Sequence, residues 1–297
     1  MYAVCSGWNG KPEVVAALLE AGADVNARND YGETALIQAA QKPEIIAALL
    51  KAGADVNVRN GHDDTVLMLH YKPEIIAILL KAGVSVNARN KDGETALMRS
   101  AKFNRWYPQA IAMLLMAGAE IDARDKGGET ALIKAAMHNG DPKIIAVLLK
   151  AGADVNARTR HDRTALMHAA ESNSNSKVFT ALLKSGADVN ARDKSGQTVL
   201  IFAAKRKSAW RNTAVIMSTL LLRGTDINAQ NKNGKTALMY AAALSNRRWE
   251  TVSLLLKSGA DARLKDKDGR MAIDFAEKNP KLRNAADVLK RLREAGE

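Results

Sequence analysis

The sequence predicts an all-α solenoid, in which helix–turn–helix repeats with projecting β-hairpin loops stack on one another. Two observations predict this fold. The string GADVNAR recurs unchanged at 22–28, 152–158 and 186–192. Its opening glycine recurs at spacings of 31, 30, 35, 34, 34, 38 and 35 residues, as Gly22, Gly53, Gly83, Gly118, Gly152, Gly186, Gly224 and Gly259. A period of this size is typical of stacked supersecondary repeats.

Each repeat is predicted to contain two helices, as residues 29–59 illustrate. The stretch NDYG has turn chemistry, and Thr34 suits the N-cap of a short helix over 35–41. Pro43 suits the first position of a second helix, and Gly53 suits its left-handed end. The apolar face of this second helix consists of Ile45, Ile46, Leu49 and Leu50. The following ADVNVR is an extended arm that leads into the next repeat.

The repeats place one domain over residues 1–297. We expect a truncated first repeat over 1–28 and a polar capping repeat over 266–297. The intervening repeats are 29–59, 60–89, 90–124, 125–158, 159–192, 193–230 and 231–265. A two-helix repeat cannot bury its apolar face alone, so each repeat needs its neighbours.

The helix-opening motif resembles that of the ankyrin repeat family. The family's T-P-L-H-x-A-A pattern has counterparts in TALIQAA (34–40), TALMRSA (95–101), TALIKAA (130–136), TALMHAA (164–170), TVLIFAA (198–204) and TALMYAA (236–242). The resemblance covers essentially the whole chain. It implies a binding scaffold without catalysis, which presents a concave surface made of hairpin tips and first helices.

Several positions depart from the pattern. His70 and Tyr71 stand where two alanines are usual, so we expect the helices of repeat 60–89 to be distorted or weakly stacked. Asp63 and Asp162 replace the turn glycine, and we expect these turns to survive because aspartate tolerates left-handed geometry.

Composition limits the classes of protein that fit. The chain lacks an apolar run long enough for a transmembrane helix and shows no secretory signal, so we expect a cytoplasmic protein without membrane insertion. Delivery into a host cell stays open. Cys5 is the single cysteine and cannot form an internal disulfide. The net charge of +12 is uneven, at −2 for residues 1–100, +4 for 101–200 and +10 for 201–297.

We predict no enzymatic activity, no cofactor and no metal site. The histidines form no H-E-x-x-H or H-x-H arrangement, and no glycine-rich phosphate-binding motif occurs. His138 and His168 lie in neighbouring repeats and could face each other, but no cysteine or paired carboxylate accompanies them.

A partner is expected to contact the first helices and the hairpins. The position of Gln38 varies between repeats, and its counterparts are Leu69, Arg99, Lys134, His168, Phe202 and Tyr240. We interpret this series as surface, and the neighbouring series Ile37, Met68, Met98, Ile133, Met167, Ile201 and Met239 as core. Tyr31, Phe103 and His138 are further candidates. The arms end in Arg28, Arg59, Arg89, Arg124, Arg158 and Arg192, which either bind a partner or pair with nearby carboxylates.

A basic edge near the C-terminus is the other candidate. All four tryptophans, Trp8, Trp106, Trp210 and Trp249, fall in breaks between paired helices. The last two bring together Lys205, Arg206, Lys207, Arg211, Arg247 and Arg248. Two interpretations stay open: a binding patch, or tryptophans packed over neighbouring loops beside solvated charges.

The sequence favours a monomeric protein-interaction module that binds an acidic protein or peptide. Two alternatives remain. The basic edge could bind nucleic acid or another anionic surface, which would be steeply salt-dependent. The chain could also be the ankyrin portion of a larger effector.

Overall fold

The computed structural model describes residues 11–39, 42–103, 106–138, 141–172, 175–206, 210–243, 249–279 and 286–296. Within these ranges the backbone forms helices and no strand, which confirms the predicted all-α repeat fold. The helices are α1 (Pro12–Glu20), α2 (Ala35–Gln38), α3 (Pro43–Lys51), α4 (Val66–Leu69), α5 (Pro73–Lys81), α6 (Ala96–Phe103), α7 (Pro108–Met116), α8 (Ala131–His138), α9 (Pro142–Lys150), α10 (Ala165–Ser172), α11 (Ser176–Lys184), α12 (Val199–Lys205), α13 (Trp210–Leu222), α14 (Ala237–Ala243), α15 (Trp249–Lys257), α16 (Ala272–Glu277) and α17 (Ala286–Glu294). None of them combines the length and the apolar composition needed to span a bilayer.

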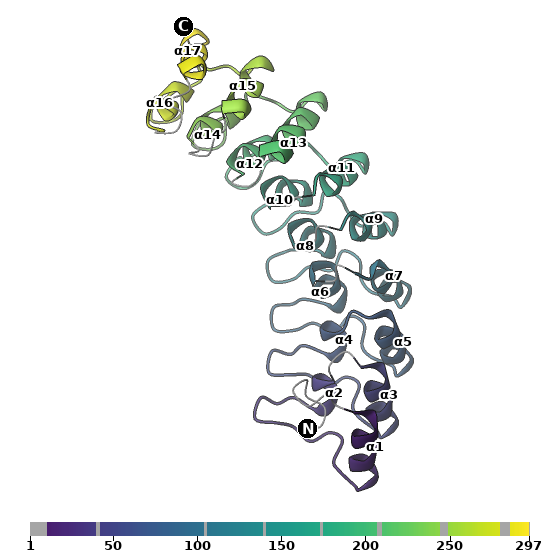
Figure 1. Ribbon diagram of the computed structural model, residues 1–297. Helices are drawn as coiled ribbons and strands as arrows, with labels where there is room; N and C mark the ends of the chain where they lie inside the picture. Colours follow the sequence, from purple (N-terminus) through teal and green to yellow (C-terminus); the bar gives the residue numbers. More distant parts are fainter. Residues whose placement is uncertain are drawn as a thin grey trace. The chain divides into compact units, whose positions relative to one another are not determined.

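The chain forms two compact units. Unit 1 comprises Met1–Ala135 and Ala146–Ala153, and unit 2 comprises Ala136–Ile145 and Asp154–Glu297. Within unit 1, the first helices α2, α4 and α6 pack in one row and the second helices α1, α3, α5 and α7 pack in another. Within unit 2, the rows are α10, α12, α14 and α16, and α11, α13, α15 and α17. The loops between repeats project beyond the first helices (Figure 1).

The core lies between the two rows of helices and between successive repeats. The predicted core series on the first helices is buried throughout, from 7% exposed at Ile37 to 0% at Ile133 and Ile201. On α3 the side chains of Ile45, Ile46 and Leu49 are buried, while Leu50 is half-buried. The helical spacing of apolar residues therefore identified the buried face correctly.

The GADVNAR arms connect each repeat to the next. Asn26 accepts a hydrogen bond from the backbone N–H of Asp55 (2.9 Å) and donates one to the carbonyl of Gly53 (3.2 Å). Arg28 Nη1 donates to the carbonyls of Gly32 (2.7 Å) and Arg59 (3.0 Å). The motif recurs because its asparagine and arginine satisfy backbone groups of both their own and the following hairpin.

The hairpins keep left-handed turns at their tips. Asp63 and Asp162 have φ of 61° and 59°, so aspartate takes the place of glycine there as predicted. The hairpin arms form two isolated antiparallel bridges among the described residues, Arg59 with Thr65 and Arg192 with Thr198. The projecting loops are therefore held mainly by side-chain and turn hydrogen bonds.

The repeat that contains His70 has a first helix of a single turn, α4. His70 is 3% exposed, lies just after α4 in extended conformation, and both its ring nitrogens lack a described hydrogen-bond partner. The preceding helix α2 is equally short although Ala39 occupies the corresponding position. The short helix is thus not specific to the histidine, and α4 still packs on α2 and α6.

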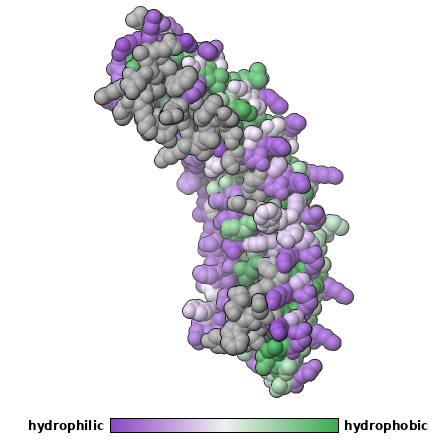
Figure 2. Space-filling model, viewed as in Figure 1, coloured by the Kyte–Doolittle hydropathy of each residue, from purple (hydrophilic) through white to green (hydrophobic). Residues whose placement is uncertain are grey.

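Hydrophobic side chains are exposed at particular places on the described surface. Val14 and Leu18 on α1 are 47% and 45% exposed, and the green surface at the lower end of Figure 2 lies where α1 is. The side from which the hairpins project is largely hydrophilic in that view. A polar contact surface is therefore expected on the hairpin side.

Candidate functional site: the first-helix face

Two positions in each repeat build the face that the first helices and hairpins share. The first, here called the base residue, ends the hairpin directly before the helix N-cap. Base residues are Glu33, Asp64, Glu94, Glu129, Arg163, Gln197, Lys235 and Arg270. The second, here called the helix residue, follows five positions later. Helix residues are Gln38, Leu69, Arg99, Lys134, His168, Phe202, Tyr240 and Phe275.

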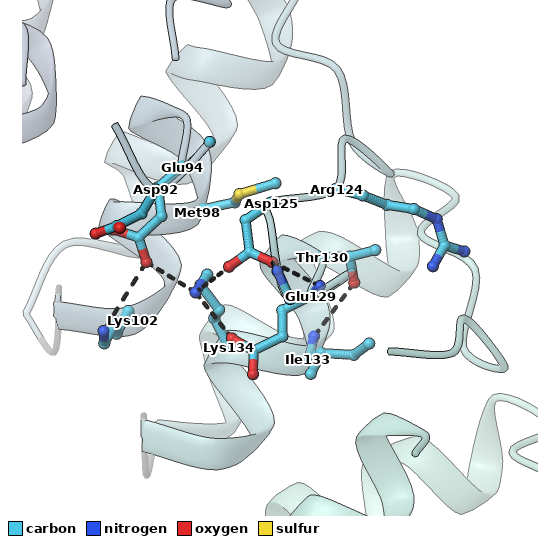
Figure 3. A network of polar contacts seen from close by, with 12 residues as sticks. Asp92, Glu94, Met98, Lys102, Arg124, Asp125, Glu129, Thr130, Ile133 and Lys134 are labelled. Carbon is cyan, nitrogen blue, oxygen red and sulfur yellow. Dashed lines mark hydrogen bonds and ion pairs between the residues drawn. The ribbon is translucent and has the colours of Figure 1, made fainter. Parts of the chain in front are cut away.

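In unit 1 these positions form a buried ion-pair network around Lys134. Its ammonium lies 2.8 Å from Glu94, 2.7 Å from Asp125 and 2.9 Å from Glu129. Figure 3 shows the three carboxylates converging on this one nitrogen. The lysine side chain is only 4% exposed, so the hairpin residues Asp125 and Glu129 enclose it together with Glu94 of the preceding repeat.

Burial and charge oppose each other in this network. Desolvation alone would lower the pKa of Lys134, but hydrogen bonds to Asp125, Glu94 and Glu129 raise it above its ordinary value. For Glu94, burial acts to raise the pKa, and the hydrogen bond and charge of Lys134 hold it below the ordinary range. Both groups therefore stay charged at neutral pH.

Arg99 extends the network to the preceding repeat. Its guanidinium lies 3.4 Å from Glu94 and 3.9 Å from Asp64, the base residues of its own and the previous repeat. The helix residue therefore sits between two successive base residues, as Lys134 does. Arg99 and Lys102 also lie 5.1 and 4.9 Å from the centroid of the Phe103 ring.

In unit 2 the same positions carry cations and aromatic rings. Phe202 is fully buried, with the Arg163 guanidinium 4.5 Å and the Lys205 ammonium 5.5 Å from its ring centroid. Lys205 lies 5.4 Å from the centroid of Tyr240 and donates a hydrogen bond to Gln197 (2.9 Å). Lys205 thus places a cation beside Gln197, which is the one neutral residue among the base residues.

Phe275 repeats this arrangement at the next pair of base residues. Lys235 lies 5.1 Å and Arg270 lies 5.0 Å from its ring centroid. Such distances are within the range of cation–π attraction. Arg163 also pairs with Glu171 (3.1 Å) and Asp193 (3.7 Å), and Arg270 pairs with Asp266 (2.9 Å). Among the described contacts of Lys205 and Lys235 there is no carboxylate.

The base residue therefore changes sign along the chain. It is acidic at Glu94 and Glu129, where it pairs with a cationic helix residue. It is basic at Arg163 and Lys235, and each of these cations lies over the aromatic helix residue of the following repeat, Phe202 or Phe275. On this face, Arg99 and Lys134 of unit 1 pair with carboxylates, whereas Lys205 and Lys235 of unit 2 lie against rings that leave their charge available.

The arm arginines have a structural role in the described residues. Arg59 donates to the carbonyl of Arg89 (2.7 Å), Arg89 to that of Arg124 (2.6 Å), and Arg124 to that of Gly128 (3.3 Å). In unit 2, Arg158 donates to the carbonyl of Arg192 (2.9 Å), and Arg192 to that of Gln230 (2.8 Å). The Arg124 contact lies within its own hairpin and the other four join successive hairpins, although all these arginines are exposed residues.

Four predicted surface residues are buried, which corrects the expectation of exposure. Lys134 is 3%, His168 6%, Phe202 0% and Arg206 1% exposed. Lys134 is enclosed by carboxylates and Phe202 is covered by two cations, so hairpin residues that the helix pattern cannot reveal cover these positions.

Arg206 was expected on the basic edge, but it lies inside unit 2. Its guanidinium donates to the carbonyls of Ala170 (3.2 Å) and Ala169 (3.5 Å) in α10. A cation at this end of a helix satisfies free carbonyls and interacts favourably with the helix dipole. Arg206 therefore belongs to the packing between repeats and is not part of an exposed edge.

The remaining candidates divide into exposed residues and residues outside the description. Tyr31 (79%), Trp106 (80%) and Phe103 (47%) are exposed, His138 is exposed, and Arg99 and Tyr240 are half-buried. Trp106 lies in the break between α6 and α7 as predicted. Trp210 and Trp249 were also expected in such breaks, but they are the first residues of α13 and α15. Their side chains, like that of Arg211, lie outside the described part. Trp8, Lys207, Arg247 and Arg248 also lie outside the described residues.

The sequence pattern missed Arg163, Lys235, Arg270 and Phe275. The base residues stand in what reads as a turn, directly before the residue that caps each first helix, which is a threonine except at Met271. A comparison of this position between repeats would have revealed the change from acidic to basic.

Within the described residues, no group of three or more His, Cys, Asp or Glu side chains could hold a metal ion.

The fold and this face define a helical repeat protein that presents a polar, variable surface on a regular scaffold. A family model described as ankyrin repeats (3 copies) matches residues 1–90, 42–125, 65–159, 106–193, 140–216, 166–266 and 200–297. The chain belongs to the ankyrin repeat family. Ankyrin repeats are generally protein–protein interaction modules and are typically non-catalytic. No curated protein matches the chain.

Proposed function

We propose that this chain is a non-catalytic module that binds an acidic segment of a partner protein through the first-helix face of unit 2. The observation that carries the proposal is the pair of lysines, Lys205 and Lys235, which lie against aromatic rings. Two further cations, Arg163 and Arg270, belong to the same face. We expect the module to act as a monomer, because the helices within each unit cover one another's apolar sides.

Rings beneath the cations favour binding in two ways. They attract the ammonium without neutralising it, and they restrict the long lysine side chains before a partner arrives. Less side-chain entropy is then lost when a carboxylate binds. In unit 1 the buried cation of this face, Lys134, already has three carboxylate partners, so that face offers less to an acidic ligand.

Selection from a displayed library of random peptides tests this function. We expect the chain to enrich peptides rich in Asp and Glu. Their affinity should fall at least about tenfold for the double variant Lys205→Glu and Lys235→Glu, because like charges then face the ligand. The matched control is Lys177→Glu with Lys184→Glu, which makes the same charge change at exposed positions of α11. Enrichment without acidic residues, or equal losses in both variants, would contradict the proposal.

Nucleic acid remains the alternative ligand. With Arg206 buried as a helix cap, the described part of the basic edge is smaller than the sequence indicated. A labelled single-stranded oligonucleotide tests this alternative at about 50 and about 200 mM salt, because phosphate contacts weaken steeply with salt. Oligonucleotide binding that survives Lys205→Glu with Lys235→Glu would assign a second surface to nucleic acid.

A further inference from the structure

Unit 2 carries one cation per repeat along the first-helix face. The cations are Arg163, Lys205, Lys235 and Arg270, which come from four consecutive repeats. Phe202 lies between the first two, and Phe275 lies between the last two. Tyr240 contacts Lys205 and accepts a hydrogen bond from Asn231. Cations and rings therefore alternate across the repeats.

The spacing of this row follows from helix packing. The first helices α10, α12, α14 and α16 each pack against the next. Packed helices lie about 8–10 Å apart. Arg163, Lys235 and Arg270 are base residues, and the Lys205 ammonium lies 2.9 Å from the base residue Gln197, so the cations recur at about this interval. An extended peptide advances about 3.3 Å per residue, and three residues therefore span about 10 Å.

Resting on the function proposed above, we propose that this row recognises an extended acidic segment with a carboxylate at every third residue. Each carboxylate would meet the cation of one repeat, and the two intervening residues would span the distance to the cation of the next repeat. The segment would run along the stacking direction of the first helices. Charge complementarity is the basis of recognition, because each ligand charge opposes a protein charge of opposite sign.

The lysines should carry the larger share of this recognition. Arg163 already shares its charge with Glu171 and Asp193, and Arg270 with Asp266. Lys205 donates to the neutral amide of Gln197, and Lys235 lies against the ring of Phe275. A ligand carboxylate at either lysine therefore adds an ion pair instead of competing with an existing one.

An extended occupant fits the face better than a helical one. A helix has a diameter of about 10–12 Å and would need carboxylates about seven residues apart to match the row. Hairpin loops project beyond the first helices and bound the face on one side (Figure 1). A single extended strand can approach half-buried side chains beside such loops more closely than a helix can.

Three synthetic peptides test the spacing by fluorescence anisotropy at about 50 mM salt, where ion pairs are weakly screened. The first has glutamate at every third residue, with serine and threonine between. The second has the same length and the same number of glutamates, placed at every second residue in its central part, with serine and threonine elsewhere. The third is an alanine-rich helical peptide with glutamate at every seventh residue. Each is titrated against the full chain and against two double variants.

The test variant is Lys205→Gln with Lys235→Gln, and the matched control is Lys194→Gln with Lys232→Gln. The control removes the same charge from exposed lysines at hairpin tips of the same repeats. We expect the every-third peptide to bind about tenfold more tightly than the other two. Its affinity should fall about tenfold in the test variant and change less than about twofold in the control.

The possible failures are distinguishable. If all three peptides bind equally and all lose affinity in the test variant, the acidic partner and its face stand but the spacing is wrong. Preference for the helical peptide would overturn the extended occupant. If no peptide binds, or if the two variants lose affinity equally, both the spacing and the proposed function are contradicted.

Discussion

At the scale of single residues, the amino acid that ends each hairpin determines the chemistry of the first-helix face. Glu94 and Glu129 enclose Lys134, whose side chain is almost inaccessible to solvent. Arg163 and Lys235 occupy the equivalent positions in unit 2 and lie on rings. The base residues and helix residues thus give the same scaffold a face of internal ion pairs in unit 1 and a basic face in unit 2.

Removing the buried cation of unit 1 should destabilise the protein strongly. Lys134→Met leaves Glu94, Asp125 and Glu129 close together without their shared partner, and breaking a buried ion pair in this way costs about 3–5 kcal/mol. Urea unfolding at neutral pH measures the loss. The deficit should shrink on acidification, because protonation of the carboxylates relieves their repulsion. The control is Lys126→Met at an exposed lysine of the same hairpin. Equal midpoints for the two variants would argue against the network.

His70 should make the stability of the chain depend on pH. Burial lowers the pKa of His70 from 6.5 to about 4, so the folded state resists protonation that the unfolded state accepts. The contribution of His70 to the free energy of unfolding is fully present above pH 6.5. It is lost as the pH falls towards 4, and the total loss is about 3 kcal/mol.

The variant His70→Ala should lose this pH dependence, because alanine has no titratable group. Alanine fits the fold at this position, since two other repeats carry it there as Ala39 and Ala135. Urea unfolding at several pH values measures the slope. His62→Ala, at an exposed histidine of the adjacent hairpin, should keep the wild-type slope. Parallel pH curves for wild type and His70→Ala would show that the buried histidine titrates normally.

At the scale of elements, the hairpins contact the next hairpin as well as closing their own turns, as the hydrogen bond from the Lys267 N–H to the carbonyl of Asn233 shows. A Cβ at Gly234 would meet backbone atoms of Asp266 and Lys267 at 2.9 Å. Gly269 has nearly the same left-handed φ, 76° against 75°, and no neighbour within 4 Å. Alanine substitutions at these two glycines therefore separate the free-energy cost of a left-handed alanine from the cost of disturbing the contact between hairpins.

Gly234→Ala should destabilise unit 2 more than Gly269→Ala does. Both substitutions place alanine in a left-handed conformation, which costs about 1–2 kcal/mol. The first also forces the two hairpins apart, so we expect it to lower the free energy of unfolding by at least about 1 kcal/mol more. Chemical denaturation of the two variants measures the difference. Equal losses would mean that the hairpins do not rely on close stacking.

Arg206 should act as a helix cap from the neighbouring repeat. Arg206→Met keeps the apolar stem but removes the donors to Ala169 and Ala170, and hydrogen bonds from charged groups contribute about 1.5–3 kcal/mol. Hydrogen exchange should accelerate in the last turn of α10. Lys194→Met, at an exposed hairpin lysine, is the control and should leave that turn unchanged. Unchanged protection of α10 in Arg206→Met would contradict the capping role.

The repeats, the helix pairs and the buried face of the first helices could be predicted from the sequence, because period and apolar spacing are local properties. The burial of Lys134, Phe202 and Arg206 could not be predicted in this way. Each is covered by residues from a hairpin or a neighbouring repeat, and the helix pattern alone carries no information on those contacts. The role of the base residues could not be predicted either, because they stand in turns, where charged side chains are usually solvated.

At the scale of the whole molecule, positive charge is concentrated in the C-terminal third of the sequence, and part of it is organised. Residues 201–297 carry a net charge of +10. Within unit 2, Lys205 and Lys235 align this charge with the first-helix face. The second helices present their own lysines, such as Lys184 and Lys257, without rings among the described contacts. The account therefore predicts that the two sides of unit 2 differ in their ability to bind an acidic chain.

Photo-crosslinking tests this central claim most directly. The peptide with glutamate at every third residue would carry a benzophenone group at one intervening position, and mass spectrometry would locate its attachment on the full chain. We predict attachment within 197–206 and 235–240, and competition by unlabelled peptide. Attachment concentrated on the second helices α13 and α15, or spread evenly over the chain, would contradict the assignment of the binding face.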